Sequence, residues 1–321
     1  MKLEHTRWHN TGWEPIAPGQ LRDAQLVLLF GSPFLLKQRG LLQSLQQAYP
    51  YAHLLGCSTA GEISDIEVLD NSLVSTAIKF EHTKLHGVRI KPRKGMSDLE
   101  AGELLAKELD KPDLVHVFVL SRGVDINGSA LVAGLTQYLP PHVTITGGLS
   151  GDGDRFQETV VLWEGQPETE SITILGFYSK QLEVGYGSLG GWETFGPRRF
   201  ITRSAGNVLY ELDGKMALSL YKAYLGDHAR GLPATGLLFP LCLLPPDSPE
   251  PVVRTILSVD EDEQSITFAG DMPMGMETRF MRADFEHLIG GAMSAARTSS
   301  QAIHSAPDLA ILISCVGRKL V

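Results

Sequence analysis

Cysteine is scarce in this chain of 321 residues, which contains only Cys57, Cys242 and Cys315. Their odd number and wide spacing argue against a disulfide framework and against a structural zinc site built on cysteine. The sequence also lacks an HExxH or CxxH motif, a phosphate-binding GxxxxGK(S/T) loop and a GxSxG nucleophile elbow. It therefore gives no indication of a conventional metalloenzyme, a P-loop enzyme or a serine hydrolase.

The chain also has fewer basic than acidic residues and contains no long hydrophobic run. Lys and Arg number 28 against 37 Asp and Glu, which gives a formal net charge of −9. Without a basic stripe, neither broad nucleic-acid binding nor attachment to an anionic membrane is expected. The longest apolar run, residues 236–244, contains Pro240 and is about half as long as the ~20 residues of a membrane helix. The N-terminus has no apolar core of signal-peptide length, so elimination favours a cytoplasmic protein without a membrane span.

The sequence does contain an ordered succession of apolar runs and helical patterns. Residues 1–24 are mixed polar and are predicted to form a lead-in segment. A strand–helix–strand–loop–strand–strand unit follows, in which Pro50 stops the helix. The predicted ranges are 26–30, 53–55, 72–80 and 85–90 for the strands, 35–49 for the helix and 56–62 for the glycine-rich loop.

The same order recurs further along the chain. The predicted ranges are 114–120, 142–146, 159–163 and 171–178 for the strands, 129–139 for the helix and 147–152 for the loop. Gly31 and Gly56 are 25 residues apart, and Ser121 and Gly147 are 26 residues apart. We interpret this as an internal duplication, with chance similarity as the alternative because the identity is weak. Such repeats predict a mixed α/β fold in which helices cover mixed β-sheets.

The C-terminal third of the sequence has a different pattern. Its predicted elements are strands at 200–203 and 207–211, helices at 216–225 and 282–297, and a hairpin around the acidic turn 260–264. Residues 309–313 (LAILI) again have the character of a first strand, which would open a third unit. The partner of that strand would lie beyond residue 321, so we expect a truncated C-terminal domain.

Several segments, in this order, resemble the FIST family. They are GCSTAGEIS at 56–64, TGGLSGDG at 146–153, GNVLYELDGKMALSLYKAYLG at 206–226, LLFPL at 237–241 and ISCVGRKLV at 313–321. The resemblance implies an N-terminal domain over residues 25–205 and a C-terminal domain over residues 206–321. It also implies a sensory module that binds a small ligand and acts on a separate signalling partner, such as a histidine kinase or a cyclic-di-nucleotide enzyme. For some members it implies haem binding and a response to nitric oxide.

The two glycine-rich loops are the best candidates for a ligand site. Because equivalent strand ends of duplicated units tend to gather on one face, we expect the loops to lie close together and to line one pocket. Small residues let a ligand approach the backbone, and successive N–H groups can form an anion-binding nest. Carboxylates in the loops would pair with a ligand amine. The alternative for each loop is a tight structural connection capped by its own hydroxyls. The candidates are Gly56, Cys57, Ser58, Thr59, Gly61 and Glu62, then Gly147, Gly148, Ser150 and Asp152, with Ser121, Arg122, Cys315 and Arg318 at strand ends.

Haem needs only one axial histidine, so His116, His228 and His287 are candidate ligands although no spacing singles them out. A satisfied core histidine is the alternative for His116, which interrupts an apolar strand. Three classes of function stay open. The resemblance favours a sensory binding module; the others are an enzyme that uses Cys57 or a loop serine, and a scaffold without a ligand.

Overall fold

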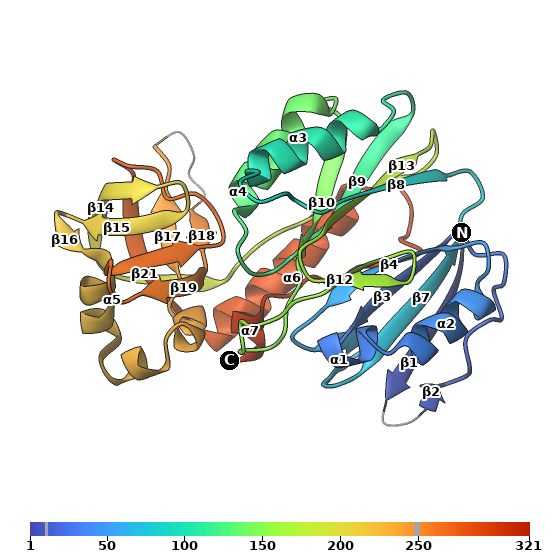
Figure 1. Ribbon diagram of the computed structural model, residues 1–321, viewed down its shortest axis with the longest axis horizontal. Helices are drawn as coiled ribbons and strands as arrows, with labels where there is room; N and C mark the ends of the chain where they lie inside the picture. Colours follow the sequence, from blue (N-terminus) through green and yellow to red (C-terminus); the bar gives the residue numbers. More distant parts are fainter. Residues whose placement is uncertain (10–11, 247–250) are drawn as a thin grey trace. The chain divides into compact units, whose positions relative to one another are not determined.

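The computed structural model describes residues 1–9, 12–246 and 251–321, which fold into two compact units (Figure 1). The first unit comprises the described residues of 1–124, together with 134–184 and 307–313. The second comprises 125–133, 314–321 and the described residues of 185–306. Each unit is therefore built from more than one segment of the chain.

A seven-stranded sheet in the first unit has the order β12-β11-β4-β3-β7-β1-β2. Its strands are β1 (Lys2–His9), β2 (Gly12–Glu14), β3 (Leu26–Gly31), β4 (His53–Ser58), β7 (Leu73–Lys79), β11 (Val161–Trp163) and β12 (Gln166–Glu168). β3 and β4 are parallel, and α1 (Pro33–Leu36) and α2 (Arg39–Ala48) form the crossover that a parallel pair requires. Leu41, Leu42 and Leu45 of α2 recur at helical spacing and are buried in a core with residues of this sheet.

The second sheet of this unit has the order β10-β9-β13-β8. Its strands are β8 (Lys84–Ile90), β9 (Leu114–Ser121), β10 (Thr144–Leu149) and β13 (Ile172–Tyr178). The helix α3 (Asp98–Glu108) precedes β9, and α4 (Gly128–Tyr138) connects the parallel strands β9 and β10. Leu28 and Cys57 of the first sheet share an apolar cluster with Phe118 and Leu175 of the second, so hydrophobic packing joins the two sheets.

The predicted duplication is visible in the two strand orders. In both β4-β3-β7 and β10-β9-β13, the central strand has a parallel neighbour on one side and an antiparallel neighbour on the other. The predicted mixed α/β class is thereby confirmed. Two strands, however, pair outside the sequence repeat to which they are assigned. β8 pairs with β13 of the second sheet, and β11 pairs with β4 of the first.

Predictions at the two ends of the sequence differ from the structure. Residues 2–9, predicted as part of a lead-in segment, form β1 beside β7. Its apolar signal is weak because polar side chains are buried there: Glu4 accepts hydrogen bonds from the backbone N–H groups of residues 19–21. The apolar run 309–313 predicts a strand, but these residues pair with no strand in the described part of the chain. Leu309 packs on the apolar cluster between the sheets, whereas Ile311, Leu312 and Ile313 are exposed.

The second unit is built on an antiparallel sheet with the path β18-β17-β21-β14-β15-β20-β19 and with β16 beside β15. The strands are β14 (Trp192–Ala205), β15 (Val208–Leu212), β16 (Lys215–Met216), β17 (Leu241–Leu244), β18 (Val252–Arg254), β19 (Ile256–Asp260), β20 (Ser265–Phe268) and β21 (Glu277–Ala283). The helix α5 (Ala217–Leu225) buries Tyr221 against Phe280 of β21.

The remaining helices of the second unit are η1 (Gly226–Gly231), η2 (Ala234–Leu238), α6 (Phe285–Gln301) and α7 (Val316–Lys319). The helix α6 begins at the N-cap residue Asp284, whose side chain accepts a hydrogen bond from the backbone N–H of His287. Across the described residues of both units, no helix is long and apolar enough to cross a membrane.

Candidate functional site

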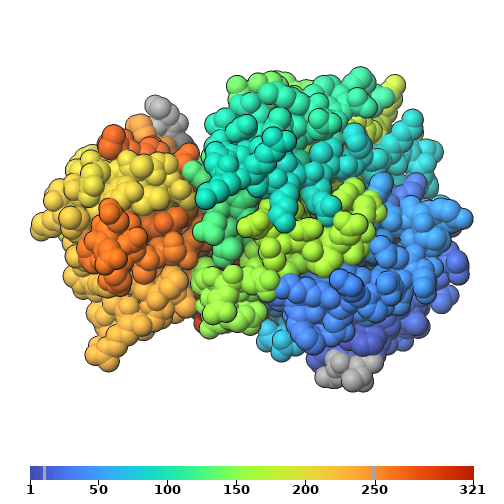
Figure 2. All heavy atoms as spheres, in the orientation of Figure 1, coloured from blue at the N-terminus to red at the C-terminus, as the bar shows by residue number. Residues whose placement is uncertain are grey.

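The two glycine-rich loops meet in the first unit. The backbone N–H of Gly151 donates a hydrogen bond of 2.7 Å to the carbonyl oxygen of Ser58. Figure 2 shows yellow-green atoms of the chain segment that follows residue 150 lying against blue atoms of the N-terminal part of the chain. We call residues 58–62 and 150–155 together the loop junction. The two loops therefore lie close together, as expected, while the pocket that they are expected to line stays a prediction.

The first glycine of each loop occupies an equivalent place in the repeat. A Cβ added at Gly56 would lie 1.9 Å from the carbonyl oxygen of Leu29, its partner on β3. A Cβ added at Gly147 would lie 1.8 Å from the carbonyl oxygen of Val119, its partner on β9. Both glycines let a parallel strand pair approach closely, which is a structural role and not a means of admitting a ligand.

The hydroxyl residues of the junction are also held by backbone partners. The N–H of Thr59 donates to the carbonyl oxygen of Gly31, and the N–H and hydroxyl of Ser150 both donate to that of Ser121. The hydroxyl oxygen of Ser58 accepts a hydrogen bond of 2.8 Å from the N–H of Val160. These bonds fix the ends of the loops on the ends of β3 and β9.

Glu62 is buried and serves its own loop. One carboxylate oxygen accepts a hydrogen bond of 2.6 Å from the hydroxyl of Thr59. The other accepts from both the N–H and the hydroxyl of Ser72, at 3.1 and 2.6 Å. The carboxylate thereby closes the hairpin of β5 (Glu62–Ser64) and β6 (Glu67–Leu69) onto the start of β7. This geometry favours the structural alternative over an ion pair with a ligand amine.

Asp152 plays the corresponding part in the second loop. Its carboxylate is buried and accepts three backbone hydrogen bonds, from Phe156 at 3.1 Å and from Gln157 and Glu158 at 3.0 Å. Arg155 lies beside it, with Nε 3.9 Å from Oδ2, and its side chain is 57% exposed. The segment therefore turns the carboxylate of Asp152 inward and exposes the neighbouring side chains of Asp154 and Arg155 to solvent.

Ser121 and Arg122 end β9 near the second loop. Arg122 forms an ion pair of 2.7 Å with Asp98, the first residue of α3, and both side chains are largely buried. The Ser121 hydroxyl is buried and has no hydrogen-bond partner in the described structure. Arg122 thus anchors the helix to the sheet, because a buried guanidinium needs a carboxylate partner.

The three cysteines lie in different environments. Cys57 points into the apolar cluster between the sheets, and this burial raises the pKa of its thiol to about 12. Burial also raises the pKa of Cys242, whereas Cys315 is exposed. A thiol that stays protonated is a poor nucleophile, so the geometry gives no support to an enzyme based on Cys57. Arg318 and Cys315 belong to the second unit, where Arg318 donates to backbone carbonyl oxygens of residues 189 and 190.

His116 has both ring nitrogens occupied. Nδ1 lies 2.7 Å from the hydroxyl oxygen of Thr144, and Nε2 lies 3.0 Å from that of Thr146. Burial lowers the pKa of His116 to about 4, so the ring is neutral at physiological pH. The structure thus favours the core histidine, whose nitrogens are not available to iron.

His228, the second haem candidate, lies in the 3-10 helix η1. His228 is exposed on η1, with its ring 5.3 Å from that of Phe239. Two pairs have HxxxH spacing, His5 with His9 and His82 with His86. His5, His9 and His86 lie in strands, where residues four apart are about 13 Å apart along the chain, so this spacing does not gather ligands.

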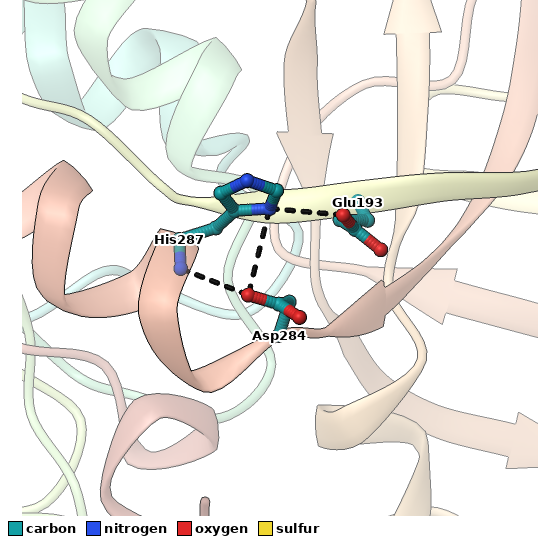
Figure 3. Close-up of side chains that lie close together, drawn as sticks. All are labelled: Glu193, Asp284 and His287. Carbon is teal, nitrogen blue, oxygen red and sulfur yellow. Dashed lines mark hydrogen bonds and ion pairs between the residues drawn. The ribbon is translucent and has the colours of Figure 1, made fainter.

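Sequence reasoning missed one cluster, which Figure 3 shows in the second unit. Glu193, Asp284 and His287 bring two carboxylates and one imidazole together, and their ligand atoms all lie within 4.8 Å of one another. The local signal was Asp284 at a helix N-cap with His287 three residues later. No local pattern could supply Glu193, because it comes from β14.

With this geometry established, comparison with known families identifies the protein class. The FIST N domain matches residues 25–215 and the FIST C domain matches residues 217–321, so the chain belongs to the FIST family. FIST domains are sensory and signal-transduction domains. No curated protein matches the chain significantly. The FIST N match includes β14, although that strand pairs with β21 in the FIST C match.

Proposed function

We propose that this protein is a cytoplasmic sensory module that binds a small ligand at the loop junction and regulates a separate signalling protein. The partner would be a histidine kinase or a cyclic-di-nucleotide enzyme. The observation that carries the proposal is the contact between the two loops in a chain that belongs to a sensory family. Loops held on a rigid sheet scaffold are where binding residues are usually found.

The arrangement favours an anionic ligand. Two of the three carboxylates of the junction, Glu62 and Asp152, are buried and engaged by their own loops, which leaves Asp154 as the exposed one. Arg155 adds an exposed guanidinium there. A guanidinium recognises carboxylate or phosphate groups through charge-assisted hydrogen bonds. A small organic acid or a phosphorylated metabolite fits this chemistry better than an amine.

The experiment starts with mass spectrometry of small molecules released from freshly purified protein. An acid or phosphate ester should be recovered, and its readdition should raise the melting temperature. Arg155→Ala should weaken binding about tenfold, because it removes the charged partner of the ligand. Arg198→Ala is the matched control, since Arg198 forms an exposed ion pair with Glu277 in the second unit.

The same preparation separates the alternatives. Absorption in the Soret region after expression with haem supplied would instead indicate the haem and nitric-oxide function, with His228 as the first ligand to mutate. If no ligand is recovered, and if adding small organic acids or phosphate esters leaves the melting temperature of the protein unchanged, a scaffold function is favoured. Equal affinity of wild-type protein and Arg155→Ala for the recovered molecule would place its site elsewhere.

A further inference from the structure

The cluster of Glu193, Asp284 and His287 lies where a strand and a helix of the second unit meet (Figure 3). Glu193 is on β14, Asp284 caps α6, and His287 is in the first turn of that helix. The imidazole Nδ1 lies 3.0 Å from Oε1 of Glu193 and 3.5 Å from Oδ1 of Asp284. The His287 side chain is 61% exposed, so solvent and ions can reach it.

Backbone pairing and helix capping hold these three residues in place. Glu193 is the ladder partner of Arg282, and Trp192 is the partner of Ala283, which immediately precedes Asp284. The Asp284 carboxylate also accepts the backbone N–H of His287 at 2.9 Å. Gly191 packs so closely on α6 that an added Cβ would lie 2.2 Å from the carbonyl oxygen of His287. The donors are therefore preorganised, which reduces the cost of ordering them around an ion.

The spacing of the donors matches a small coordination sphere. Nitrogen and oxygen ligands lie about 2.0–2.2 Å from a tetrahedral zinc ion, which places them roughly 3.4 Å from one another. The two distances from Nδ1, 3.0 and 3.5 Å, are close to this separation. The separation between the two carboxylates is within 4.8 Å, so side-chain adjustment can bring all three atoms around one ion.

We propose that Glu193, Asp284 and His287 form a binding site for a divalent transition-metal ion, specifically Zn²⁺. An imidazole with two carboxylates suits zinc better than magnesium, which prefers oxygen ligands and retains its water. Two carboxylates offset the charge of the ion, while Arg282, 3.4 Å from the second oxygen of Glu193, orients that side chain. Three protein ligands leave the fourth coordination position of the ion open to water, as in catalytic zinc sites and unlike structural ones.

The test measures metal binding by the intact, chelator-treated chain at pH 7.5. Zn²⁺ competition with a chromophoric chelator should reveal one site with a dissociation constant in the micromolar range, and Co²⁺ should give a visible absorption band. His287→Ala and Glu193→Gln should each weaken binding by ~10-fold or more. Excess Mg²⁺ should not compete.

A matched control uses another histidine–carboxylate pair of this chain. His53 forms an ion pair with a single carboxylate, Glu164, so His53→Ala should leave zinc affinity unchanged. Circular dichroism of each variant distinguishes loss of a ligand from loss of the fold. Binding that persists in both His287→Ala and Glu193→Gln, or that is lost equally in His53→Ala, would overturn the proposal, as would no binding by the wild type below millimolar Zn²⁺.

Discussion

Several side chains whose chemistry suggests a functional role are buried in the structure and engaged by their neighbours. Cys57, Glu62 and His116 all attract attention in the sequence, yet each is buried with its polar or reactive group occupied or protonated. Arg155 attracts no attention in the sequence, yet its side chain is exposed beside the buried carboxylate of Asp152. Burial and hydrogen-bond partners decide between these roles, and neither can be deduced from residue type.

The cysteines give a direct prediction at this scale. A thiol reagent such as dithionitrobenzoate should react quickly with one thiol per folded chain, because only Cys315 is exposed. Cys57 and Cys242 should react only after unfolding, since burial raises the pKa of both thiols. In Cys315→Ser, rapid labelling should vanish. Fast labelling of Cys57 in that variant would mean that the cluster between the sheets is open.

His116 predicts a defined pH dependence of stability. Its pKa falls from the ordinary 6.5 to about 4 on folding, so the unfolded chain binds the extra proton. The neutral His116 ring therefore makes its full contribution to the free energy of unfolding above pH 6.5, and this contribution is lost as the pH falls towards 4. Between pH 7.5 and pH 5, wild-type protein should lose about 2 kcal/mol more stability than His116→Gln in urea unfolding. An equal loss in both proteins would contradict the buried neutral ring.

Gly147 predicts a packing cost. Gly147→Ala should destabilise the protein by about 2 kcal/mol or more, because the new methyl group overlaps the carbonyl oxygen of Val119. Gly40→Ala on α2 is the control: nothing lies within 4 Å of an added Cβ, and alanine favours a helix by about 0.5–1 kcal/mol. Thermal unfolding of the two variants should therefore shift in opposite directions; a neutral Gly147→Ala would show that β10 can move away from β9.

At the scale of elements, the sequence was most informative where the elements are apolar. The runs that became β3 and β9 and the helical patterns of α2 and α5 predict their elements because each buries a regular set of leucines or valines. The sequence does not predict β1, because its buried positions include the polar residues Glu4 and Thr6, which give no apolar pattern. Residues 309–313 were wrongly predicted as a strand because an apolar run does not reveal whether a pairing partner is present.

The two glycine-rich loops predict opposite effects for two variants. Glu62→Gln should destabilise the protein by about 1–3 kcal/mol, because the amide nitrogen cannot accept the hydrogen bonds that the carboxylate accepts. Its ligand affinity should stay near that of the wild type. Arg155→Ala should leave the unfolding free energy within about 0.5 kcal/mol and weaken ligand binding instead. Denaturant unfolding and ligand titration of both variants test this; a stable Glu62→Gln that fails to bind would return Glu62 to the ligand site.

At the scale of the whole molecule, long-range pairing limits prediction most. The repeat correctly suggested that the two loops meet, since equivalent strand ends of duplicated units gather together. It could not show that β8 and β11 cross to the opposite sheets, because Val161 pairs with Cys57 across more than a hundred residues. The zinc-site candidate depends on Glu193 and His287 in the same way. Membership of the FIST family defines a sensory class, while the exposed guanidinium of Arg155 is the basis for proposing an anionic ligand.

Hydrogen exchange measured by mass spectrometry tests the central claim most directly. The freshly purified protein and the same protein stripped of small molecules are compared residue by residue. The account predicts slower amide exchange with ligand bound in residues 58–62 and 150–155 together, because one ligand contacts both loops. Unchanged exchange in both loops, or protection confined to the second unit, would contradict a sensory site at the loop junction.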